Sequence, residues 1–175
     1  MNDNYFLTVE NFLTTEECEN IINYNNNLFT KAEEDYVGYE KVDLMFDNDL
    51  VKNILNKLKT VIEYYKIKYK EVNYVGSQWQ FTHLRLKKFN KNKNYDIWHS
   101  EHSVRNPHRI LNLLIYLTEH NCGTKFFNGN VIKSEIGRLV IFPSYFTHTH
   151  RGEKCPDGKV RYILSGYFNF KEKNE

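Results

Sequence analysis

The sequence has few cysteines and no long apolar run. Cys18, Cys122 and Cys155 are odd in number and form no C-x-x-C pair, which excludes a disulfide framework and a zinc knuckle and predicts three reduced thiols. No apolar stretch reaches the roughly 18 residues of a membrane span, and the polar amino terminus, Met1 to Tyr5, is unlike a signal peptide. We therefore expect a cytoplasmic protein without a membrane partner.

An excess of charge of either sign is also missing. The 24 basic and 22 acidic side chains leave a net charge of +2, so there is no electrostatic basis for a nucleic-acid partner. The length of 175 residues predicts one domain over 1–175 with a core of its own. None of these properties indicates an oligomeric state.

Two helices are expected in the first part of the chain. Thr14 and Glu17 form a capping box, which predicts a helix from there to about Tyr24. A second helix is expected to begin after Asp47 or Asn48 and to bury one apolar stripe on a sheet. The stripe consists of Val51, Ile54, Leu55, Leu58, Val61, Ile62 and Tyr65.

The rest of the chain is typical of short strands separated by turns. Strands are predicted within Tyr5 to Val9 and Tyr39 to Phe46, and then at Trp79 to Phe89, Arg109 to Thr118, Thr124 to Asn128, Val131 to Lys133, Gly137 to Phe142 and Val160 to Phe170. We expect an α+β, mainly β architecture, an antiparallel barrel or jelly roll over about 77–170. Helical support over about 14–70 would brace one face of it.

The chemically distinctive motif is His99-Ser100-Glu101. In an extended segment His99 and Glu101 project to the same side, and they are two of the three ligands of a 2-His-1-carboxylate iron site. His148 and His150, two residues apart, are both candidates for the third ligand. Arg161 follows on a predicted strand that also carries Ile163, Ser165 and Tyr167 on the same face. This order indicates an iron oxygenase that holds a dicarboxylate.

Several segments resemble motifs of one family in the same order. They are Asn11 to Cys18 (N-F-L-S-x-E-E-C), Tyr95 to Glu101 (Y…H-x-D/E), Arg109 to Thr118 (R-x-L…Y-L-N), Gly123 to Phe126 (G-G-E-T-x-F, here shortened), Gly137 to Ser144 (G-R-L-x-x-F-P-S), Thr149 to Gly152 (T-H-R-G) and Gly158 to Tyr167. Together they cover most of the chain. The sequence resembles the Fe(II)/2-oxoglutarate-dependent dioxygenases, specifically the prolyl 4-hydroxylase-like branch.

The resemblance implies a double-stranded β-helix, Fe(II), 2-oxoglutarate and O₂, with ascorbate as an optional further cofactor. His99, Glu101 and His150 fall on the metal positions, although Glu101 replaces the commoner Asp. Arg161 falls on the residue that pairs with the distal carboxylate of 2-oxoglutarate, and a guanidinium suits a carboxylate. Tyr116 matches a tyrosine that hydrogen-bonds the same carboxylate, and Ser165 is the polar neighbour of Arg161 on its strand.

Substrate contacts are expected from Arg85, Arg109, Trp98 and Tyr167. Arg85 is predicted to face the pocket, where its charge would either orient an anionic substrate or be paired within the barrel. Arg109 would either contact the substrate or form a structural ion pair. Lys87 to Asn94 is expected to be a basic flap or a solvated loop before the metal motif. His83, His108 and His120 are expected to be structural or exposed, and the sequence does not decide whether His102 contributes to the site.

The family implies hydroxylation of an unactivated C–H bond, with a prolyl residue of a peptide or protein as the favoured substrate. The same chemistry on a free amino acid or another small molecule is the alternative. A nucleic-acid demethylase is disfavoured by the low net charge. A jelly-roll module that binds metal or ligand without catalysis is the alternative from a different functional class.

Overall fold

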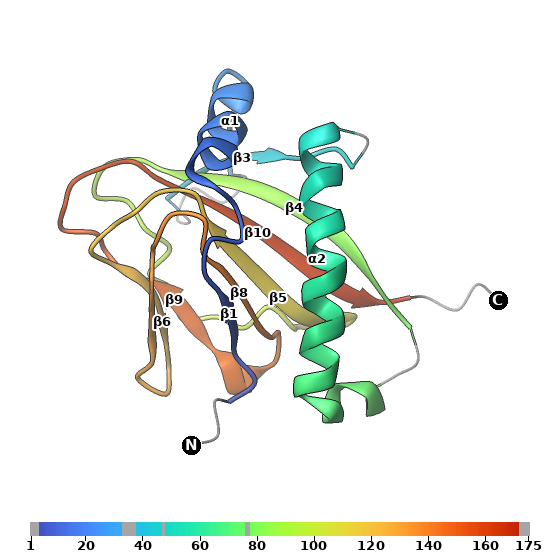
Figure 1. Cartoon of the computed structure of the whole chain (residues 1–175). Coiled ribbons are helices and arrows are strands. Elements are labelled where there is room, and N and C mark those ends of the chain that lie inside the picture. The colour runs from blue at the N-terminus through green and yellow to red at the C-terminus, as the bar shows by residue number, and fades with distance from the viewer. Residues whose placement is uncertain (1–3, 33–37, 47, 76–77, 172–175) are drawn as a thin grey trace.

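The computed structural model describes residues 4–32, 38–46, 48–75 and 78–171, which form two antiparallel sheets and two α-helices (Figure 1). The larger sheet has seven strands in the order β1 (Leu7–Val9), β8 (Leu139–Pro143), β5 (Arg109–Tyr116), β10 (Arg161–Phe170), β4 (Trp79–Phe89), β3 (Glu40–Asp43), β2 (Thr30–Lys31). The smaller sheet has three, in the order β7 (Val131–Lys133), β6 (Gly123–Phe126), β9 (His150–Gly152).

The helices begin where their capping residues predict. Thr14 precedes α1 (Thr15–Asn25), accepts a 3.1 Å bond from the Glu17 amide, and its own amide donates 2.8 Å to the Glu17 carboxylate. Asn48 precedes α2 (Asp49–Lys68) and accepts from the Leu50 amide at 2.9 Å. Asp47, the other expected cap, lies outside the described residues. Two short 3₁₀ helices, η2 (Lys70–Tyr74) and η3 (Phe146–His148), complete the description.

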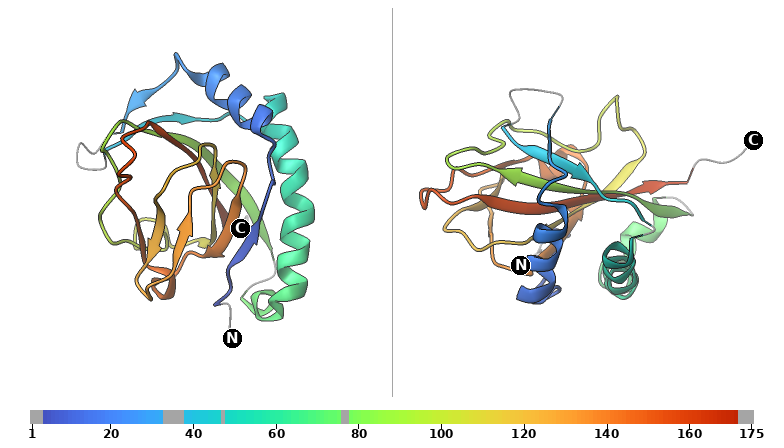
Figure 2. Two further views of the ribbon diagram at one scale, coloured as in Figure 1. Left: turned by 60° about the vertical axis from the view of Figure 1, so that its left-hand side comes forward. Right: turned by 90° about the horizontal axis from the view of Figure 1, so that it is seen from above.

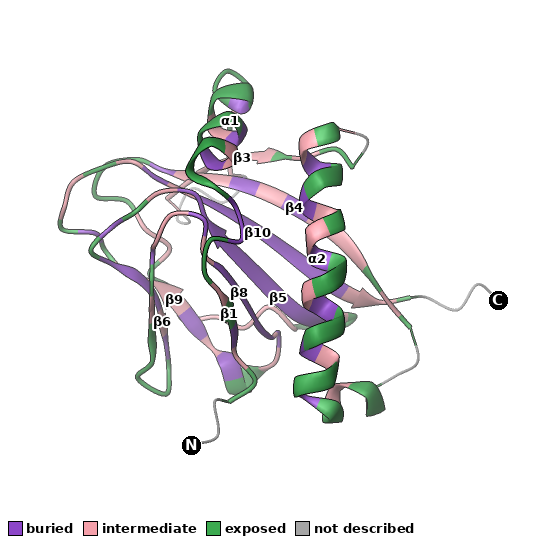
Figure 3. Cartoon of the chain, in the orientation of Figure 1, coloured by how far each residue is buried: buried purple, intermediate pink, exposed green. Residues whose placement is uncertain are grey.

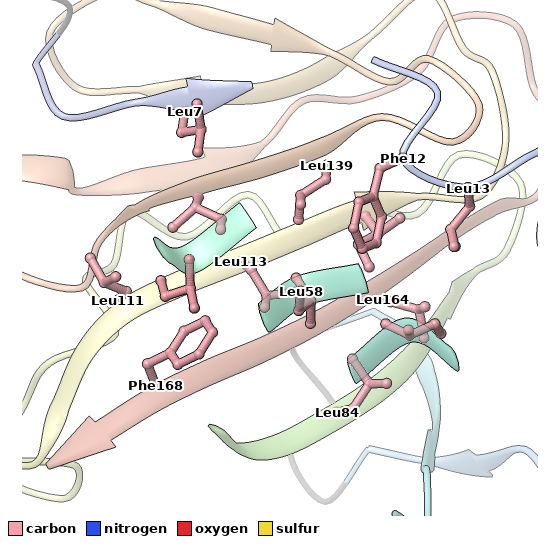
Figure 4. Packing of buried hydrophobic residues seen from close by; sticks show 14 of the residues in the cluster. Leu7, Phe12, Leu13, Leu58, Leu84, Leu111, Leu113, Leu139, Leu164 and Phe168 are labelled. Atoms are coloured by element: carbon pink, nitrogen blue, oxygen red, sulfur yellow. The ribbon is translucent and has the colours of Figure 1, made fainter. Parts of the chain in front are cut away.

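Both α-helices lie on the same side of the large sheet (Figure 2). Along β5, Leu111, Leu113 and Ile115 alternate with Asn112 and Leu114, so that opposite sides of one strand enter two different cores. The helix-side core contains the expected apolar stripe of α2, with Leu58 beside Leu113 in Figure 4. Figure 3 shows the buried stripe of α2 turned toward the sheet and the exposed stripe turned away.

The second core lies on the other face of the large sheet and joins it to the small sheet. It contains Tyr116, Val140 and Phe142 from the large sheet and Phe126 from the small one. This is the face on which Arg161, Ile163 and Ser165 of β10 alternate inward, as the strand pattern predicts. Polar groups inserted between the two sheets are therefore enclosed by apolar side chains.

Several predictions need correction. The strands are shorter than expected at β1, β5, β6, β8 and β10, and β2 and β9 were not predicted. Lys87 and Lys88 are not part of a loop, because β4 extends to Phe89. Cys122 and Cys155 form a disulfide, so the prediction of three reduced thiols is wrong for these two, while Cys18 is free and buried. Within the described residues, no helix is both long and apolar enough to cross a membrane.

The packing of α2 on the sheet gives a direct test of the helix-side core. Leu58 is 3% exposed, so Leu58→Ala should lower the free energy of unfolding by about 2–5 kcal/mol through lost burial and the cavity left behind. Lys59→Ala, one residue along on the exposed face, should change it by less than about 0.5 kcal/mol. Urea unfolding measures both, and equal effects would contradict the packing described.

Candidate metal centre

The candidate centre is built on a backbone bridge between two distant segments. His99 N–H donates to the His150 carbonyl at 3.0 Å, and His150 N–H donates to the His99 carbonyl at 2.9 Å. His150 begins β9, but the segment around His99 is not a regular strand, contrary to the extended geometry assumed from the sequence. The reciprocal pair nevertheless brings the two imidazole rings to a centroid separation of 4.4 Å.

Three side chains converge beside this bridge. Glu101 Oε1 lies 3.6 Å from His99 Nε2 and 4.0 Å from His150 Nε2, and one ligand atom from each residue lies within 4.8 Å of the others. Ligand atoms at right angles around one ion, each about 2.1 Å from it, are about 3 Å apart. A small inward shift of the side chains would therefore bring all three onto one ion.

The orientation of both imidazoles favours metal binding. His99 Nδ1 lies 2.9 Å from the Ile97 carbonyl, and His150 Nδ1 lies 3.0 Å from the His148 carbonyl. A carbonyl can only accept, so in both rings Nδ1 carries the hydrogen and Nε2 presents its lone pair to the centre. Burial and the nearby His99 lower the pKa of His150 to about 4, which keeps this ring neutral over most of the acidic range.

His150 is held in an apolar surround. Its ring centroid lies 5.1 Å from that of Phe142 and 5.5 Å from that of Phe126, and the residue is 4% exposed. His148, the alternative third ligand, is turned elsewhere: its Nε2 lies 2.6 Å from the Asn4 carbonyl. Of the two histidines, only His150 belongs to the converging group.

The carboxylate of Glu101 is held from both sides. Its Oε2 accepts a 2.8 Å bond from Arg109 Nη1, which leaves Oε1 for the centre, and its side chain is 10% exposed. Burial alone would raise the pKa of Glu101, but the nearby His99 imidazole and the charge of Lys87 outweigh burial and hold that pKa well below its ordinary range. The Glu101 side chain is longer than that of Asp. One of its oxygens therefore faces the centre while the other accepts from Arg109.

Arg109 and Tyr167, both expected from the sequence to contact substrate, support this carboxylate. The Arg109 guanidinium carbon lies 3.6 Å from the centroid of the Tyr167 ring, and Tyr167 is 6% exposed. Burial and the charge of Glu101 raise the pKa of Tyr167 well above its ordinary range. Of the two roles expected for Arg109, substrate contact or a structural ion pair, the structure shows the ion pair, with Glu101 as the partner.

Arg161 is the largest fully buried side chain, at 2% exposure. Its Nη1 donates to the Glu153 carbonyl at 3.2 Å and to the sulfurs of Cys122 at 3.2 Å and Cys155 at 3.4 Å, and its guanidinium lies 4.8 Å from the Phe89 ring centroid. Its Nε has no partner, and no carboxylate of the described chain forms an ion pair with it. A cation buried in this way is costly unless an anion accompanies it.

The neighbours of Arg161 offer further polar atoms. Ser165 is 1% exposed and its hydroxyl has no hydrogen-bond partner. The Tyr116 hydroxyl, also predicted to bind the cosubstrate, donates instead to Thr124 Oγ1 at 2.8 Å, and burial raises the pKa of Tyr116 to about 12. The Ser165 hydroxyl is therefore a buried polar group without a partner four residues along β10 from Arg161, while the Tyr116 hydroxyl is already engaged within the protein.

The remaining predicted residues lie at the edges of the site. Trp98 is half-buried, with its ring 5.2 Å from that of Phe127 and the Arg151 guanidinium 4.6 Å above it. Arg85 is paired with Asp43 through hydrogen bonds of 2.7 and 3.2 Å. Its charge is therefore paired within the protein, which was the alternative to a role in orienting an anionic substrate. Lys87, two residues further along β4, also faces the site and was not singled out from the sequence.

One hollow of the molecule lies away from the three converging residues. A cavity of about 500 Å³ is bordered by Tyr65 of α2, Leu111 of β5 and His148 of η3, and none of His99, Glu101, His150 or Arg161 lines it. Its walls are mainly apolar, although Glu71 and His148 also line it. The chemistry of the converging residues, rather than cavity size, marks the candidate site.

Comparisons with known proteins indicate the family and the fold of the chain. A family model described as the 2OG-Fe(II) oxygenase superfamily matches residues 83–169. The viral collagen prolyl hydroxylase of Paramecium Bursaria Chlorella virus-1, solved with 2OG, superposes with a TM-score of 0.72 at 16% identity over 97% of this chain and 98% of that one. No curated protein matches the sequence.

Two further solved structures are similar. A Pseudomonas putida prolyl-4-hydroxylase has a TM-score of 0.76 at 14% identity, covering 97% of this chain and 95% of its own. A Trichoplax adhaerens prolyl hydroxylase, in complex with a hypoxia inducible factor peptide fragment, has a TM-score of 0.70 at 16% identity, covering 97% and 85%. At these identities the likeness establishes a shared fold.

The three converging side chains predict binding of a divalent ion. Titration calorimetry with Mn(II) should show one site, and Glu101→Gln or His150→Gln should weaken it by more than about 100-fold, since even residues that only support metal ligands contribute 10–100-fold. His108→Gln, at an exposed histidine outside the group, serves as the control and should leave the affinity unchanged. Binding that survives both ligand substitutions would contradict the assignment.

Proposed function

Because the chain belongs to the 2OG-Fe(II) oxygenase superfamily, we propose that it is a 2-oxoglutarate-dependent dioxygenase that hydroxylates an unactivated C–H bond of a prolyl residue in a peptide or protein. The observation that carries the proposal is the pairing of two features in the region between the two sheets, around Phe89, Phe126 and Phe142, which is called the chamber below. One is the convergence of His99, Glu101 and His150, and the other is the buried Arg161 without a carboxylate partner among the described residues.

The proposed fold is a double-stranded β-helix over about 77–170, within a single domain over 1–175 braced by the helices over about 14–70. It is supported by the two antiparallel sheets that share the core around Phe126 and Phe142, and by the similarity to solved prolyl hydroxylases. In this arrangement β10 lies between β4 and β5 in the large sheet, which puts Arg161 deep in the chamber.

Fe(II) fits the donor set of the centre. His99 and His150 would bind through Nε2 and Glu101 through Oε1, a set typical of iron sites that keep positions open for other ligands. The Nδ1–carbonyl bonds fix the two rings, and Arg109 fixes the carboxylate. When bound, Fe(II) and 2-oxoglutarate supply the chemistry by which O₂ and 2-oxoglutarate become succinate and CO₂ while one oxygen atom enters the substrate.

2-Oxoglutarate fits the unpartnered polar groups. Its distal carboxylate would pair with Arg161, whose fork presents N–H groups to two oxygens at once, and would accept from the Ser165 hydroxyl. Phe89 and the surrounding apolar core exclude water from this pair, which strengthens it. The chain's own task is thus to hold the cosubstrate at one end, orient the metal ligands at the other and keep the chamber dry.

The substrate part of the proposal rests on analogy of fold. The similar solved structures are named as prolyl hydroxylases, one of them with a bound peptide fragment. Trp98 and the exposed Phe127 form an aromatic rim beside His99, a type of surface that suits a peptide chain. A small-molecule acid is a second candidate, because Lys87 forms no ion pair with a carboxylate of the described chain.

Two measurements test this function together. With Fe(II), 2-oxoglutarate and O₂, the protein should release succinate, and mass spectrometry of a panel of proline-containing peptides should find one that gains the mass of one oxygen atom. Arg161→Met should weaken 2-oxoglutarate binding to the Mn(II)-loaded protein by about 30-fold or more, because it removes a buried charge pair.

Arg138→Met is the matched control. Arg138 pairs with Glu10 and Glu135 outside the chamber, so its loss should leave 2-oxoglutarate affinity unchanged. Absence of succinate under all conditions would contradict the proposed activity. Succinate release with no oxidised peptide would retain the activity but remove the prolyl substrate.

A further inference from the structure

The chamber face of β4 carries His83, Arg85, Lys87 and Phe89, because alternate residues of a strand share a face. Two of the three polar side chains are accounted for by one acid on the neighbouring strand. Asp43 Oδ1 lies 2.7 Å from Arg85 Nε and 3.2 Å from His83 Nε2. Lys87 lies opposite Lys41 of β3 in the register, not opposite an acid.

Lys87 is therefore left without an acidic partner in the described chain. No carboxylate there lies within ion-pairing distance of its ammonium group, although Lys87 is only partly exposed. The neighbouring cations differ in this respect: Lys88, on the other face, binds Glu40 at 2.9 Å, and Arg109 binds Glu101 at 2.8 Å. An ammonium group kept from water without a counter-ion costs free energy, so the position is suited to an anion from outside the chain.

The position of Lys87 places it within the proposed active site. It pairs across the sheet with Ile163, which in turn pairs with Tyr116, so all three lie in one row across the chamber. Lys87 therefore lies on the same face of the large sheet as Ile163 and Tyr116, which is the face that packs on the small sheet.

An aromatic wall connects Lys87 to the metal ligands. The Lys87 ammonium lies 5.1 Å from the Tyr39 ring centroid, the Tyr39 ring 6.5 Å from that of Tyr95, and the Tyr95 ring 4.3 Å from that of His99. These rings offer a flat surface for the carbon skeleton of a substrate, with a cation at one end and the metal ligands at the other. Such an arrangement selects an amphipathic molecule with one anionic end.

We propose that Lys87 binds a carboxylate of the primary substrate, so that the molecule hydroxylated by this protein is an acid oriented between Lys87 and the metal centre. This inference rests on the proposed function and narrows its substrate class. The role that the sequence suggested for Arg85 falls to Lys87 instead, because Asp43 already neutralises Arg85. Arg161 remains the partner of 2-oxoglutarate.

The charges of the loaded site favour such a substrate. Fe(II) and the Glu101 carboxylate together carry a charge of +1, and dianionic 2-oxoglutarate and Arg161 together carry −1, so these four groups cancel. Arg109 and Lys87 then add positive charge to the site. A substrate carboxylate offsets part of this excess in a chamber where charges are weakly screened. The carboxylate has two sources: the free carboxylate of an amino acid, or an acidic side chain next to the oxidised residue of a peptide.

The test compares acids with their amides as binding probes. Protein loaded with Mn(II) and saturating 2-oxoglutarate is titrated without O₂ with two matched pairs. One pair is L-proline and L-prolinamide, and the other is an N-acetylated, C-amidated tetrapeptide with glutamate after proline and the same peptide with glutamine. In the pair that represents the true source, the acid should bind at least about tenfold more tightly than the amide.

Two substitutions at adjacent lysines complete the test. Lys87→Met should abolish the preference for the acid, whereas Lys88→Met, which alters the lysine on the opposite face, should preserve it. Both variants should bind 2-oxoglutarate as the unchanged protein does. Thermal unfolding checks that each variant folds, and Lys87→Gln serves as the second variant if Lys87→Met does not.

Three results would overturn the inference. They are equal binding of acid and amide in both pairs, a preference that persists without Lys87, and a loss of 2-oxoglutarate affinity in the Lys87 variants, which would assign Lys87 to the cosubstrate. This third result is distinct from a failure of the proposed function. In that case the unchanged protein would not bind 2-oxoglutarate, and both proposals would be wrong.

Discussion

The burial of a guanidinium without a carboxylate partner in the described chain is the constraint on which the proposed site depends. Arg161 is held by the Glu153 carbonyl and by the sulfurs of the Cys122–Cys155 disulfide, and these weak or neutral acceptors do not neutralise its charge. Gly152 permits this packing, because a Cβ there would lie 3.2 Å from Arg161 Nη2. The structure thus keeps a positive charge among apolar side chains. This burial costs free energy unless an anion binds beside the charge.

The metal ligands depend on a different constraint, the reciprocal backbone pair between His99 and His150. It ties the irregular segment before Glu101 to β9 of the small sheet, while Arg161 comes from the centre of the large sheet. The core around Phe126 and Phe142 keeps the two sheets together. The proposed cosubstrate site on the large sheet therefore faces the proposed metal site, which is tied to the small sheet through His150, and the proposed function requires the shared core to be stable.

Local and periodic features could be predicted from the sequence, because neighbouring residues alone determine them. The Thr14 capping box, the buried stripe of α2 and the inward face of β10 are of this kind. Features that depend on pairing between distant segments do not follow from local patterns, and the convergence of His99, Glu101 and His150 was expected only because the sequence resembles a known family. The disulfide needs Cys122 and Cys155 to meet, and the neutralisation of Arg85 needs β3 to place Asp43 beside it, and neither pairing is visible in the local sequence.

The central claim is that one molecule of 2-oxoglutarate joins the metal centre to Arg161, and the coupling between metal and 2-oxoglutarate binding tests it most directly. Calorimetric titration of 2-oxoglutarate into the protein, with and without Mn(II) and in the absence of O₂, measures this coupling, which must be reciprocal. The account predicts that Mn(II) raises 2-oxoglutarate affinity by at least about tenfold. Equal affinity with and without the metal would contradict it.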